Sequence, residues 1–189
     1  MRRVAIFASG SGTNAENIIK QFFYSENIMV AAVFCNKPNA PVIEKVRRYG
    51  IAAVVFGRED LYDTNRVLRD LRDFEIDFIV LAGFMWLVPD YLIKEYPNKI
   101  INIHPALLPK YGGKGMYGSK VHQAVIDNKE KESGITIHYV NEHYDDGQII
   151  YQHKCKVSAD ETSESLAKKV HQLEYEHYPQ VIEEIIAGI

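Results

Sequence analysis

Residues 4–14, which read Val4-Ala5-Ile6-Phe7-Ala8-Ser9-Gly10-Ser11-Gly12-Thr13-Asn14, decide the fold of this chain. The first five side chains form an unbroken apolar run, whereas a strand with one face in water would alternate apolar and polar residues. Such a run is typical of a strand that is buried on both faces of a parallel sheet. Serines and glycines follow, and then apolar residues at helical spacing up to Tyr24. This order of strand, tight turn and helix predicts the start of a βαβ unit.

The same alternation continues through the first half of the chain. Strand-like apolar runs recur at residues 30–35, 52–56, 78–81 and 100–104, and helical patterns lie between them at residues 41–49, 62–74 and 89–96. Parallel strands that alternate with helices build an open sheet with helices on both faces. We therefore predict an α/β fold, with a doubly wound, mostly parallel sheet flanked by helices.

The pattern changes after residue 119. A short helix is predicted at residues 120–127, and two strand-like segments, residues 134–140 and 149–157, flank an acidic turn. This arrangement predicts antiparallel strands in the C-terminal half, added to the far side of the sheet. A last amphipathic helix begins near Thr162, and Pro179 is expected to kink or split it.

The composition excludes several classes of protein. The 189 residues fit one domain, 47% of them are hydrophobic, and the formal net charge is −3. A chain of this balance can build its own core, and it has no global basic field to attract nucleic acid or an anionic membrane. No stretch approaches the roughly 18 apolar residues of a membrane-spanning helix. We therefore expect a cytoplasmic protein that binds neither nucleic acid nor membrane.

The cysteines and histidines show no metal-binding pattern. Cys35 and Cys155 lie far apart, and the seven histidines do not form an H-E-x-x-H string. We expect two reduced thiols and no bound metal. His138 lies among apolar residues of a predicted strand, so we expect a core histidine with a hydrogen-bond partner.

The first candidate site is the turn Ser11-Gly12-Thr13-Asn14, between the first strand and the first helix. The N–H groups and partial positive charge of a helix N-terminus favour an anion there, and phosphate fits best. The turn also matches the loose dinucleotide pattern G-x-G-x-x-A, which requires an acidic residue after the second strand. The chain has Asn36 and Lys37 in that region. A single phosphate is therefore favoured over a dinucleotide, and a purely structural turn remains the alternative.

The second candidate site joins Asn102 and His104, which point to the same face of the last parallel strand. The carboxyl ends of such strands line the ligand crevice of a doubly wound sheet. There an amide and an imidazole together can stabilise an oxyanion. Asp145, in the acidic turn, is the candidate carboxylate partner that would orient the imidazole. The alternatives are a strand-end histidine held by backbone hydrogen bonds and a merely solvated acidic turn.

Four strings in this order also carry a resemblance to a known family. They are S-G-S-G-T-N at residues 9–14, L-A-G-F-M at 81–85, I-N-I-H-P-A-L-L-P at 101–109 and D-D-G-Q-I-I at 145–150. Over essentially its whole length the chain resembles the formyltetrahydrofolate-dependent formyltransferases. Its first turn and its single-domain length are similar to the members that formylate glycinamide ribonucleotide in purine synthesis. The resemblance implies small-molecule substrates, with 10-formyltetrahydrofolate as the co-substrate.

The resemblance also implies roles for individual residues. The matching residues are Asn102, His104 and Asp145 for catalysis; Ser11, Gly12, Thr13, Asn14 and Glu174 for the nucleotide substrate; and Arg58, Met85, Trp86, Leu87, Val88 and Asn102 for the folate. Residues 1–104 would then form a nucleotide-binding half of the single domain. Residues 105–189 would contribute the folate site and the C-terminal helix.

Three features depart from the family pattern, and three rival functions stay open. Trp86 stands where relatives often have arginine, and Asp146 replaces a small residue. The segment Lys110–Ser119 is longer than in many relatives, and it could form either a flexible lid or a plain surface loop. The rivals are formyl transfer to another amine such as a nucleotide-linked amino sugar, a non-catalytic folate- or nucleotide-binding module, and a dinucleotide oxidoreductase. The sequence leaves the oligomeric state open, with a weak homodimer as one candidate.

Overall fold

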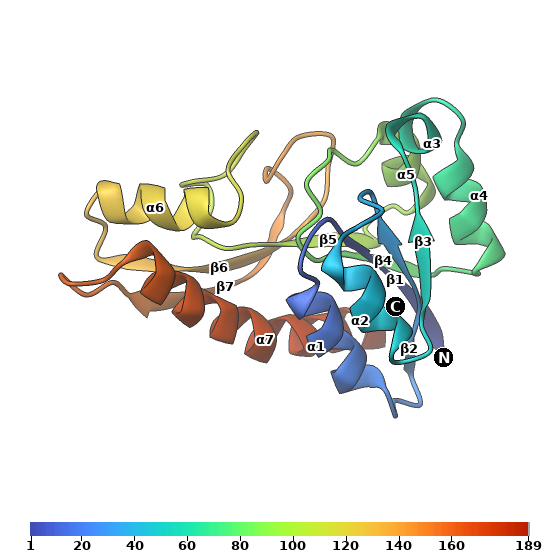
Figure 1. Cartoon of the computed structure of the whole chain (residues 1–189), viewed down its shortest axis with the longest axis horizontal. Helices are drawn as coiled ribbons and strands as arrows, with labels where there is room; N and C mark the ends of the chain where they lie inside the picture. The colour runs from blue at the N-terminus through green and yellow to red at the C-terminus, as the bar shows by residue number, and fades with distance from the viewer. Residues whose placement is uncertain (189) are drawn as a thin grey trace.

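Residues 1–188, the part that the computed structural model describes, contain one sheet of seven strands (Figure 1). The strand order is β3-β2-β1-β4-β5-β6-β7. The first five strands pair in parallel, and β6 and β7 are added as antiparallel strands. The predicted fold class is therefore confirmed. The strands are β1 (Arg2–Ala8), β2 (Ile28–Cys35), β3 (Ala52–Val55), β4 (Phe78–Leu81), β5 (Ile100–His104), β6 (Glu132–Tyr139) and β7 (Ile149–Lys156).

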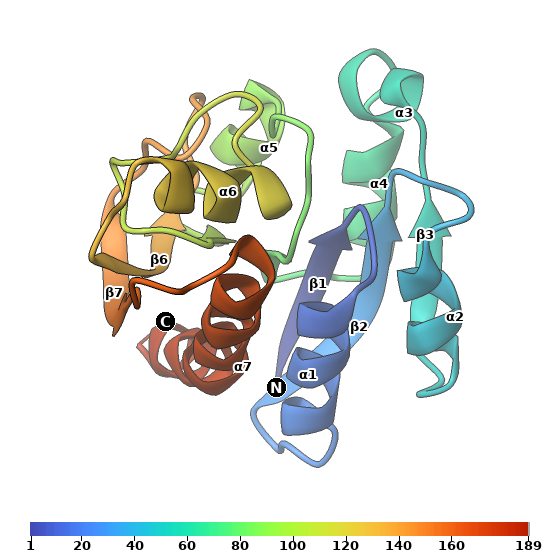
Figure 2. The same ribbon diagram turned by 60° about the vertical axis from the view of Figure 1, so that its left-hand side comes forward.

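Helices cover both faces of the sheet. Successive side chains of its inner strands point to opposite faces, and both sets are buried. Val4 and Ile6 of β1 pack in the same core cluster as α1, α2 and α7, whereas Ala5 and Phe7 pack with α3, α4 and α5. Helix α6 lies beside α7 (Figures 1 and 2). The helices are α1 (Thr13–Phe22), α2 (Pro41–Arg47), α3 (Arg58–Tyr62), α4 (Arg66–Asp73), α5 (Asp90–Glu95), α6 (Ser119–Asp127) and α7 (Ser163–Ala187).

The prediction of one helix at residues 62–74 is wrong. Two helices, α3 and α4, occupy residues 58–73, and they are separated at Asn65, whose φ is 53°. Asparagine tolerates this left-handed conformation better than other residues with a side chain, and a helix cannot continue through it. The first helix begins early because the Asp60 carboxylate accepts a hydrogen bond from the Gly57 N–H at 2.7 Å.

Pro179 does not split the last helix, since α7 runs without interruption from Ser163 to Ala187. Proline has no N–H, so it leaves the carbonyl four residues earlier without its helical donor. That carbonyl belongs to Tyr175, and the side-chain amide of Asn17, on α1, donates a hydrogen bond to it at 2.9 Å. A side chain of a neighbouring helix thus compensates for the proline.

The strand order reverses next to β1, between its neighbours β2 and β4. Ligands of doubly wound proteins bind in the crevice outside the carboxyl ends of the strands at such a switch point. Here Ser9, just after β1, joins the segment after β4: its N–H donates to the Gly83 carbonyl at 3.1 Å, and its hydroxyl accepts from the Met85 N–H at 3.0 Å. Within residues 1–188, no helix is both long enough and apolar enough to cross a bilayer.

Candidate active site

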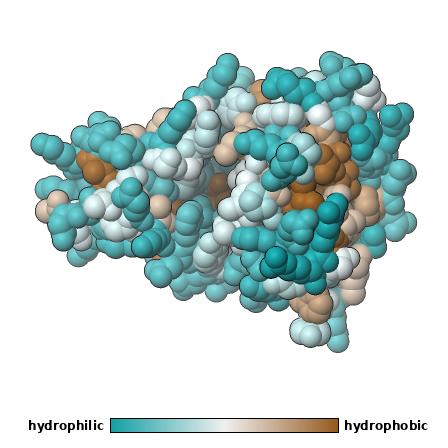
Figure 3. Space-filling model, viewed as in Figure 1, coloured by the Kyte–Doolittle hydropathy of each residue, from teal (hydrophilic) through white to brown (hydrophobic). Residues whose placement is uncertain are grey.

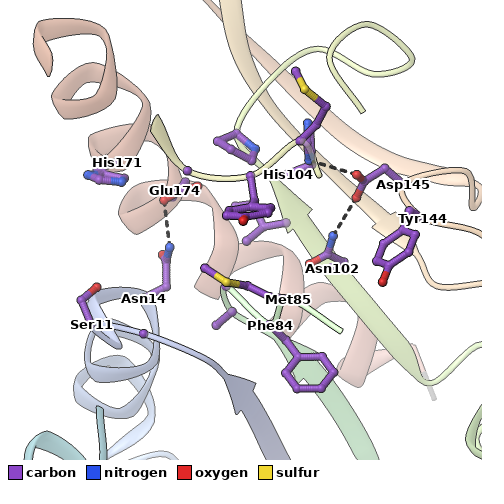
Figure 4. Close-up of a pocket in the computed structure, with 18 of the residues that line it drawn as sticks. Ser11, Asn14, Phe84, Met85, Asn102, His104, Tyr144, Asp145, His171 and Glu174 are labelled. Atoms are coloured by element: carbon purple, nitrogen blue, oxygen red, sulfur yellow. Dashed lines mark hydrogen bonds and ion pairs between the residues drawn. The ribbon is translucent and has the colours of Figure 1, made fainter. Parts of the chain in front are cut away.

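A cavity of about 470 Å³ opens at this switch point, and the surface is hollowed near the middle of the view in Figure 3. It brings together segments that lie far apart in the sequence: the turn before α1, the ends of β4 and β5, the loop before α6, the turn after β6, and α7 (Figure 4). Of the residues selected from the sequence, the lining includes Ser11, Gly12, Thr13, Asn14, Met85, Asn102, His104, Asp145 and Glu174.

Asn102, His104 and Asp145 lie together at one end of the cavity (Figure 4). Nδ1 of His104 is 3.5 Å from Oδ2 of Asp145, and Nδ2 of Asn102 donates to Oδ1 of the same carboxylate at 3.3 Å. Strand β5 supplies the first two side chains, on one face as expected. Asp145 reaches them from the turn between β6 and β7, where its φ is 54°. The three candidates from distant stretches therefore meet at one point.

His138 joins this group from β6, where it pairs in register with Asn102. Its ring is only 2% exposed, and Nδ1 lies 2.8 Å from the Tyr139 carbonyl, which can only accept a hydrogen bond. In the neutral ring Nε2 is then the acceptor, and Nδ2 of Asn102 lies 3.2 Å from it. A buried and partnered histidine was predicted, but its place beside Asn102 was not, because it depends on the register of β5 against β6.

Burial and charge act in opposite directions on His104 and Asp145. Burial lowers the pKa of His104 below its ordinary value, although the Asp145 carboxylate and the Tyr111 carbonyl act against this change. Burial alone would raise the pKa of Asp145, but His138, His104 and the Gly113 N–H together lower it. The carboxylate is therefore ionised at neutral pH, and the imidazole beside it is neutral.

The turn before α1 forms the other end of the cavity. Gly12 has a φ of 69°, and a β-carbon at this position would lie 2.9 Å from the Val42 Cα, so the turn requires glycine. Helix α1 begins directly after Gly12, and no side chain in the described part of the chain caps it. The N-terminus of α1 thus faces the cavity with Ser11 and Thr13 beside it, an arrangement suited to an anion.

Glu174 of α7 lines the same end of the cavity. The side chain is 5% exposed, and burial raises its pKa to about 7, although a hydrogen bond from Asn14 Nδ2 at 2.8 Å acts against this (Figure 4). Two histidines that sequence reasoning missed, His122 and His171, lie nearby, with ring centroids 6.4 Å apart. Nδ1 of His122 is buried without a hydrogen-bond partner among residues 1–188. This unpaired nitrogen marks His122 as a candidate site residue, and it could be found only from the folded chain.

The folate candidates divide into two sets. Met85 and Asn102 line the cavity, whereas Arg58, Trp86, Leu87 and Val88 are not part of its lining. Trp86 adjoins it through Phe84, whose ring centroid is 6.4 Å away, and the Arg58 guanidinium lies 5.2 Å from the centroids of both Trp86 and Tyr62. Arg58 thus rests on an aromatic surface near the cavity, which holds its charge in place.

Residues 1–188 contain no group of three or more histidine, cysteine or acidic side chains arranged to bind a metal ion. In the cavity, the described side chains offer an amide, an imidazole and a carboxylate, and the other end of the cavity is a helix N-terminus. Such a set can orient a carbonyl compound and stabilise a negative oxygen.

Comparisons with known proteins agree with this chemistry. A profile of the formyl transferase family matches residues 2–182. The chain is 40% identical to a chloroplastic phosphoribosylglycinamide formyltransferase of Arabidopsis thaliana. The matched region covers 96% of the chain but only 64% of the plant protein. It covers 60% of the Vigna unguiculata counterpart. It is also 36% identical to the phosphoribosylglycinamide formyltransferase of Bacillus subtilis, with 98% of the chain and 95% of that protein covered.

Solved structures give the same result. The phosphoribosylglycinamide formyltransferase of Bacillus halodurans is 37% identical, with a TM-score of 0.87 over 98% of this chain and 95% of that one. The Anaplasma phagocytophilum enzyme is 32% identical, with a TM-score of 0.90 over 98% and 87% of the two chains. With a family profile that spans nearly all of the described residues, and with the amide, imidazole and carboxylate in one cavity, this chain belongs to the formyl transferase family.

Proposed function

We propose that the protein transfers the formyl group of 10-formyltetrahydrofolate to the amine of glycinamide ribonucleotide, as a phosphoribosylglycinamide formyltransferase of purine biosynthesis. The observation that carries this proposal is the layout of one cavity, with Asn102, His104 and Asp145 at one end and the turn before α1, at the N-terminus of that helix, at the other. A ribonucleotide whose phosphate occupies the turn could extend its amine toward the catalytic end. The names of the bacterial relatives, which the chain covers almost fully, support the same acceptor.

In the proposed reaction the acceptor amine attacks the formyl carbon, and the formyl oxygen becomes negatively charged. Asn102 donates an N–H to this oxyanion, and His104, once it carries a second proton, stabilises it by its positive charge. The hydrogen bond from Asn102 to Asp145 is long at 3.3 Å and therefore weak. Little stabilisation is lost when this N–H turns toward the oxyanion. A new carbon–nitrogen bond forms to the acceptor, and the bond from the formyl carbon to the folate nitrogen breaks.

The proton balance of this reaction involves the His104–Asp145 pair. A nearby negative charge raises the pKa of an imidazole, so His104 takes up its second proton as the oxyanion forms, with Asp145 already ionised beside it. The amine loses one proton overall and the folate nitrogen gains one. We assign this transfer to the His104–Asp145 pair, with one water as the relay. Much of the rate acceleration would come from holding the two substrates together.

Each substrate has a proposed location. The phosphate of the ribonucleotide would bind at Ser11-Gly12-Thr13-Asn14, and Glu174 would contact the nucleotide. The folate would enter along Met85, Trp86, Leu87 and Val88, with its ring against the backbone of that segment and with Arg58 as a further contact. These residues stay predictions from the family resemblance.

The test is a direct assay with purified protein, glycinamide ribonucleotide and 10-formyltetrahydrofolate, in which the release of tetrahydrofolate is followed. A nucleotide-linked amino sugar replaces the acceptor in a parallel reaction. Turnover that requires glycinamide ribonucleotide supports the proposal. Turnover with the amino sugar only, or tight binding of both substrates without turnover, would contradict it and favour one of the rival functions.

A further inference from the structure

The segment Tyr111–Gly113, in the loop before α6, contacts both members of the His104–Asp145 pair. The carbonyl oxygen of Tyr111 lies 2.8 Å from Nε2 of His104. The N–H of Gly113 donates to Oδ2 of Asp145 at 2.9 Å, and this is the same oxygen that faces Nδ1 of His104. Three consecutive residues therefore set the position of the imidazole and of the carboxylate together.

The contact with Tyr111 also fixes which nitrogen of His104 carries a proton. A carbonyl oxygen can only accept a hydrogen bond, so Nε2 must be the donor. The nitrogen that gains and loses a proton is then Nδ1, which faces Asp145. Without the Tyr111 carbonyl, the proton of the neutral ring would move to Nδ1, because a carboxylate attracts it there. The catalytic imidazole would then start the reaction in the wrong tautomer.

A carboxylate outside the cavity holds Tyr111 in place. Oε1 of Glu130 accepts hydrogen bonds from the Tyr111 hydroxyl at 2.9 Å and from the Lys110 ammonium at 2.8 Å. Both contacts lower the pKa of Glu130, so this anchor is ionised at neutral pH. Glu130 follows α6, to which its N–H is joined through the Val125 carbonyl at 3.2 Å. Tyr111 has a φ of 58°, a conformation that needs support for a bulky residue.

We propose that Glu130 is a positioning residue for His104, which holds Tyr111 so that its carbonyl keeps the proton on Nε2 and leaves Nδ1 to exchange protons beside Asp145. This role rests on the proposed formyl transfer. The titratable groups that face His104 are Asp145, His138 and His122. Glu130 acts on the imidazole only through Tyr111, and neither Glu130 nor Tyr111 belongs to the cavity lining.

The experiment compares Glu130→Ala, which removes the acceptor of the Tyr111 hydroxyl, and Tyr111→Phe with the unmodified chain. Tyr111→Phe removes only the hydroxyl that binds Glu130. Glu132→Ala is the matched control, because Glu132 carries the same charge two residues away and binds Lys154 instead. For each protein, kcat and both KM values are measured from pH 5.5 to 9. The tautomer of His104 is read from the ¹⁵N shifts of its ring nitrogens, assigned by comparison with His104→Gln.

We expect both variants to lower kcat by about tenfold, less than the roughly 100-fold that a misplacement of 1 Å can cause. Both KM values should change less than about twofold, because the binding surfaces are untouched. The Tyr111 carbonyl raises the pKa of His104. Losing it should therefore move the pH midpoint of kcat downward and shift the ¹⁵N spectrum toward the Nδ1–H tautomer. The double variant should be no slower than either single one, because both cut the same link.

A wild-type kcat, pH midpoint and Nε2–H tautomer in both variants would overturn the proposal while the proposed function stood. If the unmodified protein failed to formylate glycinamide ribonucleotide, the proposed function would fail, and the tautomer spectra would still decide the role of Glu130. If Glu130→Ala did not fold, Tyr111→Phe, which keeps the aromatic ring and the Glu130–Lys110 contact, would decide it alone.

Discussion

His104 and Asp145 face each other at 3.5 Å, Nδ1 to Oδ2, although one ends the last parallel strand and the other lies in the turn beyond β6. Around this pair the chain has buried an imidazole whose pKa is lowered and a carboxylate whose pKa is also lowered. The carboxylate supplies a negative charge that makes the imidazole a better proton acceptor at the moment when charge develops nearby.

Asp145→Asn tests this relationship. The amide keeps the shape of the side chain and removes its charge, so His104 loses the anion that favours its second proton. We expect kcat to fall by roughly 10²–10³-fold, the usual cost of losing one oxyanion-stabilising group, and the KM for the ribonucleotide to stay nearly constant. Asp146→Asn is the matched control, because this neighbour binds only Asn141 among the described side chains. Wild-type turnover in Asp145→Asn would remove Asp145 from the mechanism.

The pH dependence of stability tests the environment of Glu174. Burial raises its pKa to about 7 in the folded protein, whereas the ordinary value is 4.5. Between these two pH values the folded chain holds a proton that the unfolded chain has released. The stability that is fully present below pH 4.5 is therefore lost as the pH rises toward 7, by an amount on the order of 3 kcal/mol.

Glu174→Gln should remove this dependence, because a glutamine has no proton to lose and still accepts the bond from Asn14. The free energy of unfolding would be measured in urea at pH 5, 6, 7 and 8. We expect the difference between the variant and the wild-type protein to grow in favour of the variant as the pH rises. Glu183→Gln, on an exposed part of the same helix, should leave the slope unchanged. Parallel curves for Glu174→Gln and the wild-type protein would mean that the carboxyl has an ordinary pKa.

Gly12→Ala tests the turn before α1. The left-handed φ of 69° and the nearby Val42 backbone both oppose a β-carbon at this position. We expect a loss of roughly 2 kcal/mol or more in the free energy of unfolding, since strain and overpacking add. Gly10→Ala is the matched control for stability, because no atom lies within 4 Å of the β-carbon that it would add. Equal melting temperatures for the two variants would contradict this account of the turn.

Most of the sheet and half of the site could be predicted from the sequence. Val4–Ala8 is a continuous apolar strand followed by Ser9-Gly10, and Ile100–His104 is a strand-like segment ended by Pro105. This pattern predicts both the parallel sheet and the place of Asn102 and His104. The position of His138 could not be predicted, because it depends on the register of an antiparallel pair that no local signal sets. The break at Asn65 was missed because a charged helical pattern continues on both sides of it.

The Tyr111–Glu130 contact was beyond sequence reasoning for another reason. It joins a loop to the residue after the next helix through side-chain hydrogen bonds, and neither residue type indicates such a partner by itself. The same holds for Asn17, whose amide serves the carbonyl that Pro179 leaves unpaired. Glu130 accepts from a side-chain hydroxyl and Asn17 donates to a backbone carbonyl, and in both cases only tertiary packing shows which side chain is the partner.

A double-mutant cycle on Asn17 and Pro179 tests the second of these contacts. Asn17→Ala removes the donor to the Tyr175 carbonyl and should lower the free energy of unfolding by about 1–2 kcal/mol, since a partly buried acceptor is left unpaired. Pro179→Ala restores the backbone N–H that donates to the Tyr175 carbonyl in a regular helix. In the Pro179→Ala background, Asn17→Ala should therefore cost about 1 kcal/mol less. Asn17→Asp, which places an acceptor against the carbonyl, should cost at least as much as alanine in the wild-type background. If Asn17→Ala had the same cost in both backgrounds, the asparagine would stabilise α7 by packing and not by replacing the missing donor.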